Sequence, residues 1–106
     1  MIEKDKINEI INKIVINYLP EKIILFGSYA GGTPNADSDI DLLIIKQTTT
    51  LRHRRAIEVN KYLYRSMFPI DILVYTPEEY EQEQISKYSF LSSALKNSIV
   101  LYERKD

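Results

Sequence analysis

Hydrophobic and polar positions alternate along the chain with two different periods, one helical and one strand-like. Over residues 3–18, apolar side chains recur every three or four positions, which predicts an amphipathic helix that ends before Pro20. Two short, mostly apolar stretches, 23–26 and 39–46, predict β-strands. Residues 28–37 between them are rich in turn-forming residues and predict a loop.

The second half of the chain continues this alternation. Residues 51–67 predict a helix, whose inward stripe consists of Ala56, Ile57, Asn60, Leu63 and Met67. Residues 70–75 predict a third strand, which Pro69 opens, and 99–102 predict a short edge strand. A helix over 87–96 is expected to turn four residues inward: Phe90, Leu91, Ala94 and Leu95.

A separate signal marks a helix start after the third strand. Thr76 suits the N-cap, Pro77 the first helical position, and Glu79 the carboxylate position of a capping box. The resulting order, α-β-loop-β-α-β-α-α-β, predicts an α+β (mixed α/β) fold. A length of 106 residues with 44% hydrophobic content fits one domain over 1–106.

Composition restricts the chemistry that this chain can perform. It has no cysteine and a single histidine, His53, so a metal site would need oxygen ligands, which suits magnesium. A formal net charge of -1 argues against a dedicated nucleic-acid binder. The sequence has no apolar run of membrane-spanning length and no signal-peptide pattern, so we expect a cytoplasmic protein that does not bind a membrane.

Three aspartates are the candidate metal ligands. Asp39 and Asp41 lie two positions apart at the start of a predicted strand, so their side chains share one face. Asp71 lies early in the third strand, and it would face the same pocket if the two strands are neighbours. Three such carboxylates could hold two cations, which suits phosphoryl or nucleotidyl transfer.

A glycine turn precedes the aspartates. Gly27 ends the first strand, and its backbone allows close approach to a phosphate, while the Ser28 hydroxyl adds a donor. Ser38 is also assigned to the nucleotide site, because its hydroxyl can orient the turn before Asp39. An isolated Asp-x-Asp or Gly-Ser usually marks only a turn, but Gly-Ser, ten residues and Asp-x-Asp between two strands is a specific combination.

The stretch LFGSYAGGTPNADSDIDLLI (25–44) resembles the signature of the DNA polymerase beta-like nucleotidyltransferase superfamily. With FPIDILVY, the ending ALKNSIVLYER and the small size, the chain resembles its minimal nucleotidyltransferase (MNT) family. The resemblance implies a nucleotidyltransferase fold with a mixed three- to four-stranded sheet flanked by helices. It also implies that Gly27 and Ser28 hold a triphosphate. Asp39 and Asp41 would bind Mg2+ in a two-metal site, and Asp71 would complete that site and help to deprotonate the acceptor.

The same resemblance implies a function and a partner. Minimal members commonly pair with a HEPN-domain toxin, and some transfer AMP from ATP to a tyrosine of that toxin. The chain would then be an adenylyltransferase antitoxin. Many relatives carry basic residues where this chain has Tyr29 and Gly31, so an antitoxin that neutralises its HEPN partner by binding alone remains the alternative. An antibiotic-type small-molecule transferase and a polymerase are less favoured, because such proteins carry additional binding modules.

The sequence does not decide the role of one charged surface. The helix over 51–67 carries six basic residues: Arg52, His53, Arg54, Arg55, Lys61 and Arg65. The favoured interpretation is a solvated basic face. A contact surface for an acidic partner, or for the nucleotide, is the other.

Overall fold

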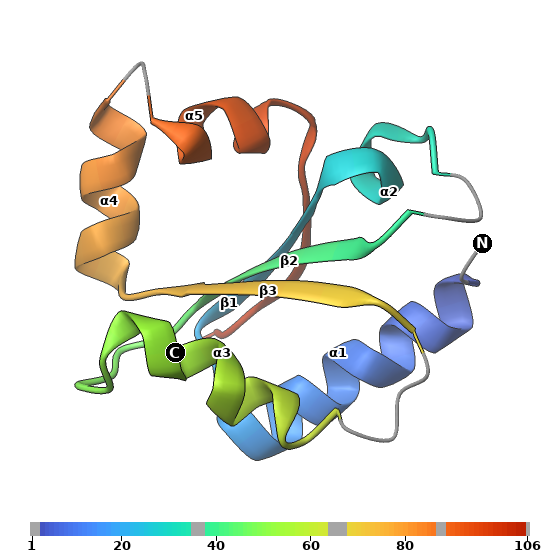
Figure 1. The fold of residues 1–106 in the computed structure, drawn as a ribbon, viewed down its shortest axis with the longest axis horizontal. Helices are drawn as coiled ribbons and strands as arrows, with labels where there is room; N and C mark the ends of the chain where they lie inside the picture. Colours follow the sequence, from blue (N-terminus) through green and yellow to red (C-terminus); the bar gives the residue numbers. More distant parts are fainter. Residues whose placement is uncertain (1–2, 35–37, 64–67, 87–88, 106) are drawn as a thin grey trace.

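The centre of the fold is a four-stranded sheet in the order β3-β2-β1-β4 (Figure 1). This computed structural model describes residues 3–34, 38–63, 68–86 and 89–105. The strands are β1 (Lys22–Phe26), β2 (Ile40–Ile45), β3 (Ile70–Tyr75) and β4 (Ile99–Glu103). Strand β1 is antiparallel to β2 and β4, whereas β2 and β3 are parallel. The predicted mixed sheet flanked by helices is therefore confirmed.

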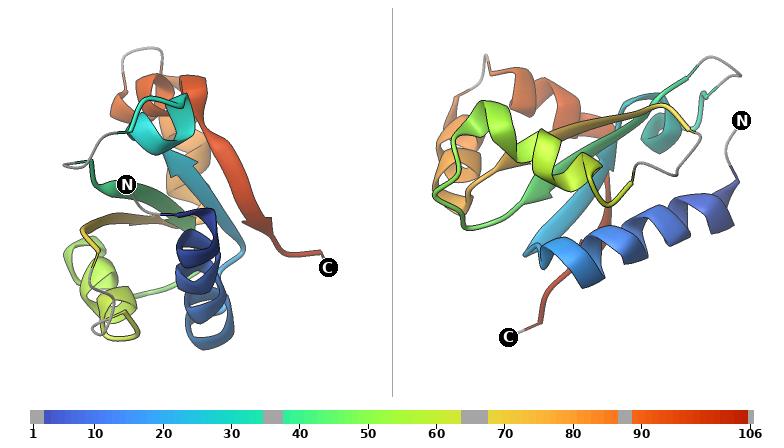
Figure 2. Two further views of the ribbon diagram at one scale, coloured as in Figure 1. Left: turned by 90° about the vertical axis from the view of Figure 1, so that its right-hand side faces the viewer. Right: turned by 60° about the horizontal axis from the view of Figure 1, so that its bottom comes forward.

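Helices cover both faces of the sheet (Figure 2). They are α1 (Lys4–Tyr18), α2 (Gly27–Gly31), α3 (Arg52–Asn60), α4 (Pro77–Ile85) and α5 (Phe90–Ala94), and a 3-10 turn, η1 (Leu95–Asn97), follows α5. Helices α1 and α3 pack on one face, and α4 and α5 on the other. Among the described residues, no helix is both long enough and apolar enough to cross a membrane.

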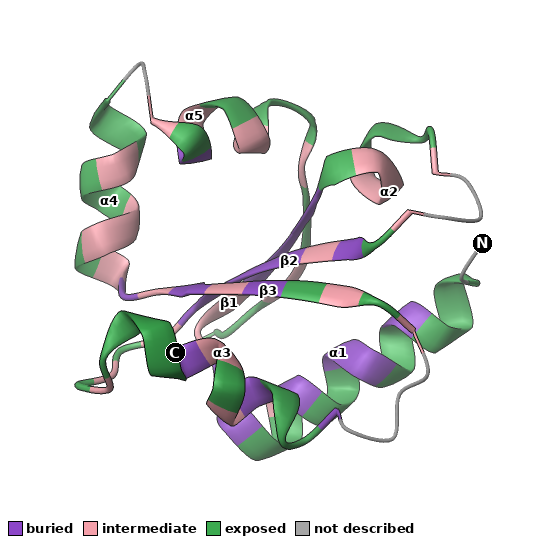
Figure 3. Cartoon of the chain, viewed as in Figure 1, coloured by how far each residue is buried: buried purple, intermediate pink, exposed green. Residues whose placement is uncertain are grey.

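The two core clusters follow from the alternation of side chains along the central strands. In β1, Ile23 and Leu25 face α1, whereas Ile24 and Phe26 face α5. Both faces are covered, so β1 and β2 are almost wholly buried, and Figure 3 shows this buried centre. This explains why the sequence pattern here is a short apolar run rather than strict alternation.

Two sequence predictions need correction in the first half of the chain. The loop predicted over 28–37 begins as a one-turn helix, α2, and residues 35–37 lie outside the described residues. The helix predicted over 51–67 ends earlier, because α3 ends at Asn60 and a turn follows. Residues 64–67 lie outside the described residues.

The inward stripe predicted for α3 was right only in part: Ala56 packs against the core as predicted, whereas two other members do not. Ile57 is 59% exposed and Asn60 is exposed, whereas Arg55 and Val59 are buried. Leu63, beyond the helix end, is buried as predicted, whereas Met67 lies outside the described residues. The helix is rotated so that an arginine, rather than an isoleucine, faces the protein.

The C-terminal helix also differs from its prediction. Instead of one helix over 87–96, the structure has α5 and the turn η1, and residues 87–88 lie outside the described residues. Leu91 is buried as predicted, and Ala94 and Leu95 pack against the core cluster. Phe90 is 60% exposed, and its ring makes an edge-to-face contact with Phe26.

Arg55 is buried because polar groups surround its guanidinium. It donates to both carboxylate oxygens of Glu79, with N–O distances of 2.6 and 3.4 Å. It also donates to the backbone carbonyls of Thr50 and Val74, at 2.8 and 3.3 Å. The sequence placed Arg55 on a solvated face, which was wrong; its neighbours His53 and Arg54 are exposed as predicted.

Glu79 is held by the capping box as well as by arginine. Its carboxylate accepts from the Thr76 backbone N–H at 2.8 Å, and the Thr76 hydroxyl accepts from the Glu79 N–H at 3.2 Å, which confirms the predicted box. Burial alone would raise the pKa of Glu79, but hydrogen bonds from Arg55 and Thr76 and the Arg55 charge lower it to about 2. The charge of Arg52 contributes to the same lowering of the pKa.

Replacing Glu79 with glutamine is expected to lower the free energy of unfolding by about 3 kcal/mol at pH 7, because Arg55 would stay buried without a counter-charge. The folded pKa of Glu79 lies below its ordinary value of 4.5, so the charged pair stabilises the fold above that value. This contribution is lost as the pH falls toward 2. Urea unfolding of wild type and Glu79→Gln should therefore give curves that converge below pH 4; a constant difference would contradict this assignment.

Candidate active site

Two of the three predicted aspartates are brought together by the parallel strands. Asp41 on β2 pairs in register with Asp71 on β3, so the two side chains lie on the same face of the sheet. Strand β1 ends beside them, with Phe26 opposite Asp41. Because Phe26 faces α5, the carboxylates also project on the α5 face.

The electrostatics of this pair favour a bound cation. Burial raises the pKa of Asp41 above its ordinary value, and the charges of Asp71 and Asp39, with a hydrogen bond to Asp71, raise it further. A divalent cation with oxygen ligands would relieve this repulsion, so the donor set has the chemistry that magnesium requires.

The third predicted ligand stands slightly apart. Asp39 precedes β2 and is exposed, and its charge reaches Asp41. Within the described ranges, no three carboxylates or imidazoles are gathered closely enough to form a metal centre. The structure thus assembles two carboxylates, and the three-ligand site remains a prediction.

Gly27 is positioned directly against the carboxylate pair. Its φ is +75°, a backbone conformation that favours glycine. A Cβ atom placed on Gly27 would collide with Oδ2 of Asp41 and would lie 3.1 Å from its Cγ. The turn after β1 and the carboxylate on β2 therefore form one packed unit, in which no side chain larger than that of glycine fits.

Helix α2 begins at this glycine and carries Ser28 in its first turn. The N-cap residue of α2, Phe26, makes no side-chain cap hydrogen bond, and the first turn of the helix lies at the end of β1. The Ser28 carbonyl accepts from the N–H of Gly32 and from that of Thr33, the latter at 3.0 Å, and so closes the turn. A Cβ on Gly31 would meet nothing within 4 Å, so the space beyond α2 is open.

A hollow of about 620 Å³ adjoins this turn. Its lining residues come from the β1–α2 turn and from the α5–η1 segment: Phe26, Gly27, Ser28, Gly31, Thr33, Phe90, Ser93, Ala94 and Asn97. Sequence analysis gave the α5–η1 residues no role in the site, although Ala94 and Asn97 lie in the ending ALKNSIVLYER that carries the family resemblance. A further signal is the alternation of Ser93 and Asn97 with apolar positions at the end of a predicted core helix.

Ser38 is half-buried and directly precedes Asp39, as the sequence requires. The residues 35–37 before it lie outside the described residues. Its assignment to the nucleotide site therefore stays a prediction.

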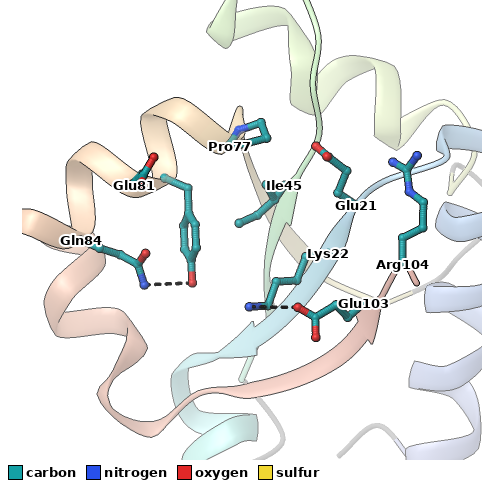
Figure 4. A pocket seen from close by; sticks show the side chains of 9 residues that line it. Glu21, Lys22, Ile45, Pro77, Glu81, Gln84, Glu103 and Arg104 are labelled. Carbon is teal, nitrogen blue, oxygen red and sulfur yellow. Dashed lines mark hydrogen bonds and ion pairs between the residues drawn. The ribbon is translucent and has the colours of Figure 1, made fainter. Parts of the chain in front are cut away.

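A second hollow, of about 400 Å³, lies at the opposite end of the sheet (Figure 4). It is bounded by the start of β1 and the ends of β2 and β4, where Lys22 pairs with Glu103 at 3.7 Å. Tyr80 from α4 enters it, accepting from the Gln84 amide at 3.2 Å. It contains none of the site residues predicted from the sequence, so we assign the chemistry to the carboxylate end.

A mixed sheet with a glycine turn packed on a strand carboxylate is the arrangement that the sequence signature predicted for a nucleotidyltransferase domain. The chain belongs to the family described as Polymerase beta, Nucleotidyltransferase, whose model matches residues 6–106. No curated protein matches it.

Solved structures show the same fold. A candidate nucleotidyltransferase from Sulfolobus solfataricus superposes with a TM-score of 0.66 at 19% identity, covering 94% of this chain and 79% of the other. A toxin–antitoxin MntA-HpeT mutant with two Asp-to-Glu substitutions superposes with a TM-score of 0.63 at 21% identity, covering 92% of this chain and 73% of the other. A toxin–antitoxin with AMP-PNP superposes with a TM-score of 0.61 at 21% identity, covering 98% of this chain and 76% of the other.

Proposed function

We propose that this protein is a metal-dependent nucleotidyltransferase that transfers AMP from ATP to a hydroxyl group. One observation carries the proposal: Gly27, at the start of the turn predicted to hold phosphates, packs directly on Asp41, which pairs in register with Asp71. A triphosphate on this turn would lie beside both carboxylates. Membership of the nucleotidyltransferase family supports the same reaction class.

Each residue has a role that follows from its position. The N–H groups of Gly27 and Ser28 and the Ser28 hydroxyl bind the triphosphate oxygens. The nucleoside enters the adjoining hollow beside Phe90 and Asn97, where an exposed ring and an amide are available. Ser38 supports the turn before Asp39.

The carboxylates hold the metal and the acceptor. Asp39, Asp41 and Asp71 would hold Mg2+, which when bound neutralises charge on the attacking and leaving oxygens. Asp71, exposed at the edge of the site, accepts the proton of the acceptor hydroxyl. The acceptor oxygen then bonds to the α-phosphorus, the bond from that phosphorus to the bridging oxygen breaks, and pyrophosphate leaves.

The proposed acceptor is a tyrosine of a HEPN-domain toxin. This chain would then be the antitoxin of the pair and a member of the MNT family. The signature over 25–44 supports the family, and two similar folds belong to toxin–antitoxin proteins, one of them with AMP-PNP. Neutralisation by binding alone is the second candidate, because the open Gly31 leaves the phosphate turn without the basic residue found in many relatives.

A transfer assay separates the two candidates. The protein is incubated with Mg2+, α-labelled ATP and the HEPN-domain protein, beside an Asp39→Asn, Asp41→Asn variant. We expect label on the partner with wild type and none with the variant. If no label appears while the two proteins form a tight complex, the enzymatic proposal fails and the binding antitoxin stands.

Replacing Ser28 with alanine is expected to raise the KM for ATP about tenfold, which corresponds to the loss of one hydrogen bond to a charged phosphate. Alanine is a good helix former, so α2 should persist and circular dichroism should not change. Steady-state transfer kinetics would check this. An unchanged KM would remove the Ser28 hydroxyl from the triphosphate site.

A further inference from the structure

The outward face of α3 presents two cations around an exposed isoleucine. Arg54 and Lys61 flank Ile57, which is 59% exposed, and a hollow of about 380 Å³ lies among these residues and Glu58. Within the described part of the chain, neither Arg54 nor Lys61 forms an ion pair. Arg52 and Arg55, by contrast, both form ion pairs with Glu79.

The outward face of α4 presents the opposite chemistry. Glu78, Glu81 and Gln82 are exposed and share one helical face with Ile85. Ile85 is 80% exposed, although such a side chain usually packs against protein. No ion pair involves these two glutamates in the ranges that the structure describes.

We propose that the α4 face of one copy docks on the α3 face of a second copy of this chain. Ile85 enters the hollow between Arg54 and Lys61 and covers Ile57. Glu81 lies one helical turn from Ile85, about 6 Å along the axis, and Glu78 lies one turn further in the same direction. With Ile85 over Ile57, the two carboxylates therefore extend toward the cation on one side of Ile57. Each copy of the chain therefore carries both of the surfaces that the contact needs, the α3 face and the α4 face.

The position of the two helices allows this contact to form twice. The N-terminal ends of α3 and α4 are tied together through Glu79, which binds Arg52 at 3.4 Å and Arg55 at 2.6 Å. Helices α3 and α4 thus both begin at one end of the molecule, away from α2 (Figure 1). A two-fold axis there would match each α3 with the partner's α4. The net charge of -1 leaves little repulsion between copies.

Sedimentation equilibrium with charge reversals tests this proposal. Wild type should reach twice the mass of one chain as its concentration rises. Arg54→Glu with Lys61→Glu, and separately Glu78→Lys with Glu81→Lys, should each raise the dimer dissociation constant about tenfold or more, because like charges then meet. An equimolar mixture of the two variants should associate again, because both of its contacts pair opposite charges.

Matched controls separate the contact from a general charge effect. Lys4→Glu with Lys13→Glu, on α1, changes the net charge by the same amount as Arg54→Glu with Lys61→Glu and should leave the dissociation constant unchanged. Ile85→Glu should raise the dissociation constant. A wild-type monomer at every concentration would overturn the proposal. So would a mixture that fails to associate. The reversed residues lie outside the carboxylate site, so AMP transfer should persist in all these variants, whichever way the association result falls.

Discussion

Replacing Gly27 with alanine is expected to reduce AMP transfer by about 100-fold or more. The new Cβ would collide with Oδ2 of Asp41, so either the turn or the carboxylate must move. A displacement of about 1 Å in a catalytic group commonly costs a factor of about 100 in rate. The positive φ of +75° adds a conformational cost of about 1–2 kcal/mol to the folded state.

Gly32 offers a matched control for this substitution. Its φ is +78°, close to that of Gly27, but a Cβ there meets nothing within 4 Å. Gly32→Ala should therefore carry a similar stability cost, about 1–2 kcal/mol, and keep its transfer activity. Thermal unfolding and transfer rates measured for both variants would decide the matter. Equal activity in the two variants would mean that the contact between Gly27 and Asp41 does not matter for the reaction.

Replacing Asp41 with asparagine is expected to lower the transfer rate about 1,000-fold, since a metal ligand that stabilises charge in the transition state is worth several kcal/mol. The same change should not lower stability in the absence of metal. Burial, Asp71 and Asp39 raise the pKa of Asp41, so its charged form is disfavoured in the folded state. Asparagine keeps the shape and removes the charge.

The pH dependence of Asp41 has the opposite sign to that of Glu79. A raised pKa means that the folded state binds the proton more tightly, so its contribution to stability falls as the pH rises from the ordinary value of 3.8 through the raised value. Metal-free wild type should thus gain stability relative to Asp41→Asn as the pH falls. A variant that is clearly less stable than wild type at pH 7 would indicate a structural role for this carboxylate.

The strands and the capping box could be predicted because local sequence determines them. Strand β3 has the predicted bounds, Ile70–Tyr75, because Pro69 and Thr76 mark its two ends. The spacing predicted one face for Asp39 and Asp41, but β2 begins at Ile40, so only Asp41 lies within the sheet. Their neighbour Asp71 could be paired with them only if β2 and β3 were adjacent, and long-range pairing of that kind is decided by the whole fold.

Two of the failures depend on groups that are distant in sequence, namely the placement of Arg55 and the missed hollow. Arg55 was placed in solvent because its carboxylate partner, Glu79, lies 24 residues away beyond a strand. Phe90 was placed in the core because an aromatic side chain in a helical pattern usually packs inward. The hollow beside Gly27 was missed because its far wall, from α5 and η1, meets α2 only in the tertiary fold.

The central claim is that the Gly27 turn and the strand carboxylates act as one metal–nucleotide site. Calorimetric titration with AMP-PNP, with and without Mg2+, tests it most directly in wild type and in Asp41→Asn. We predict binding that Mg2+ strengthens in wild type and that gains little from Mg2+ in the variant. Equal strengthening by Mg2+ in both proteins would contradict the account, because the metal would then bind without the carboxylate on which the turn is packed.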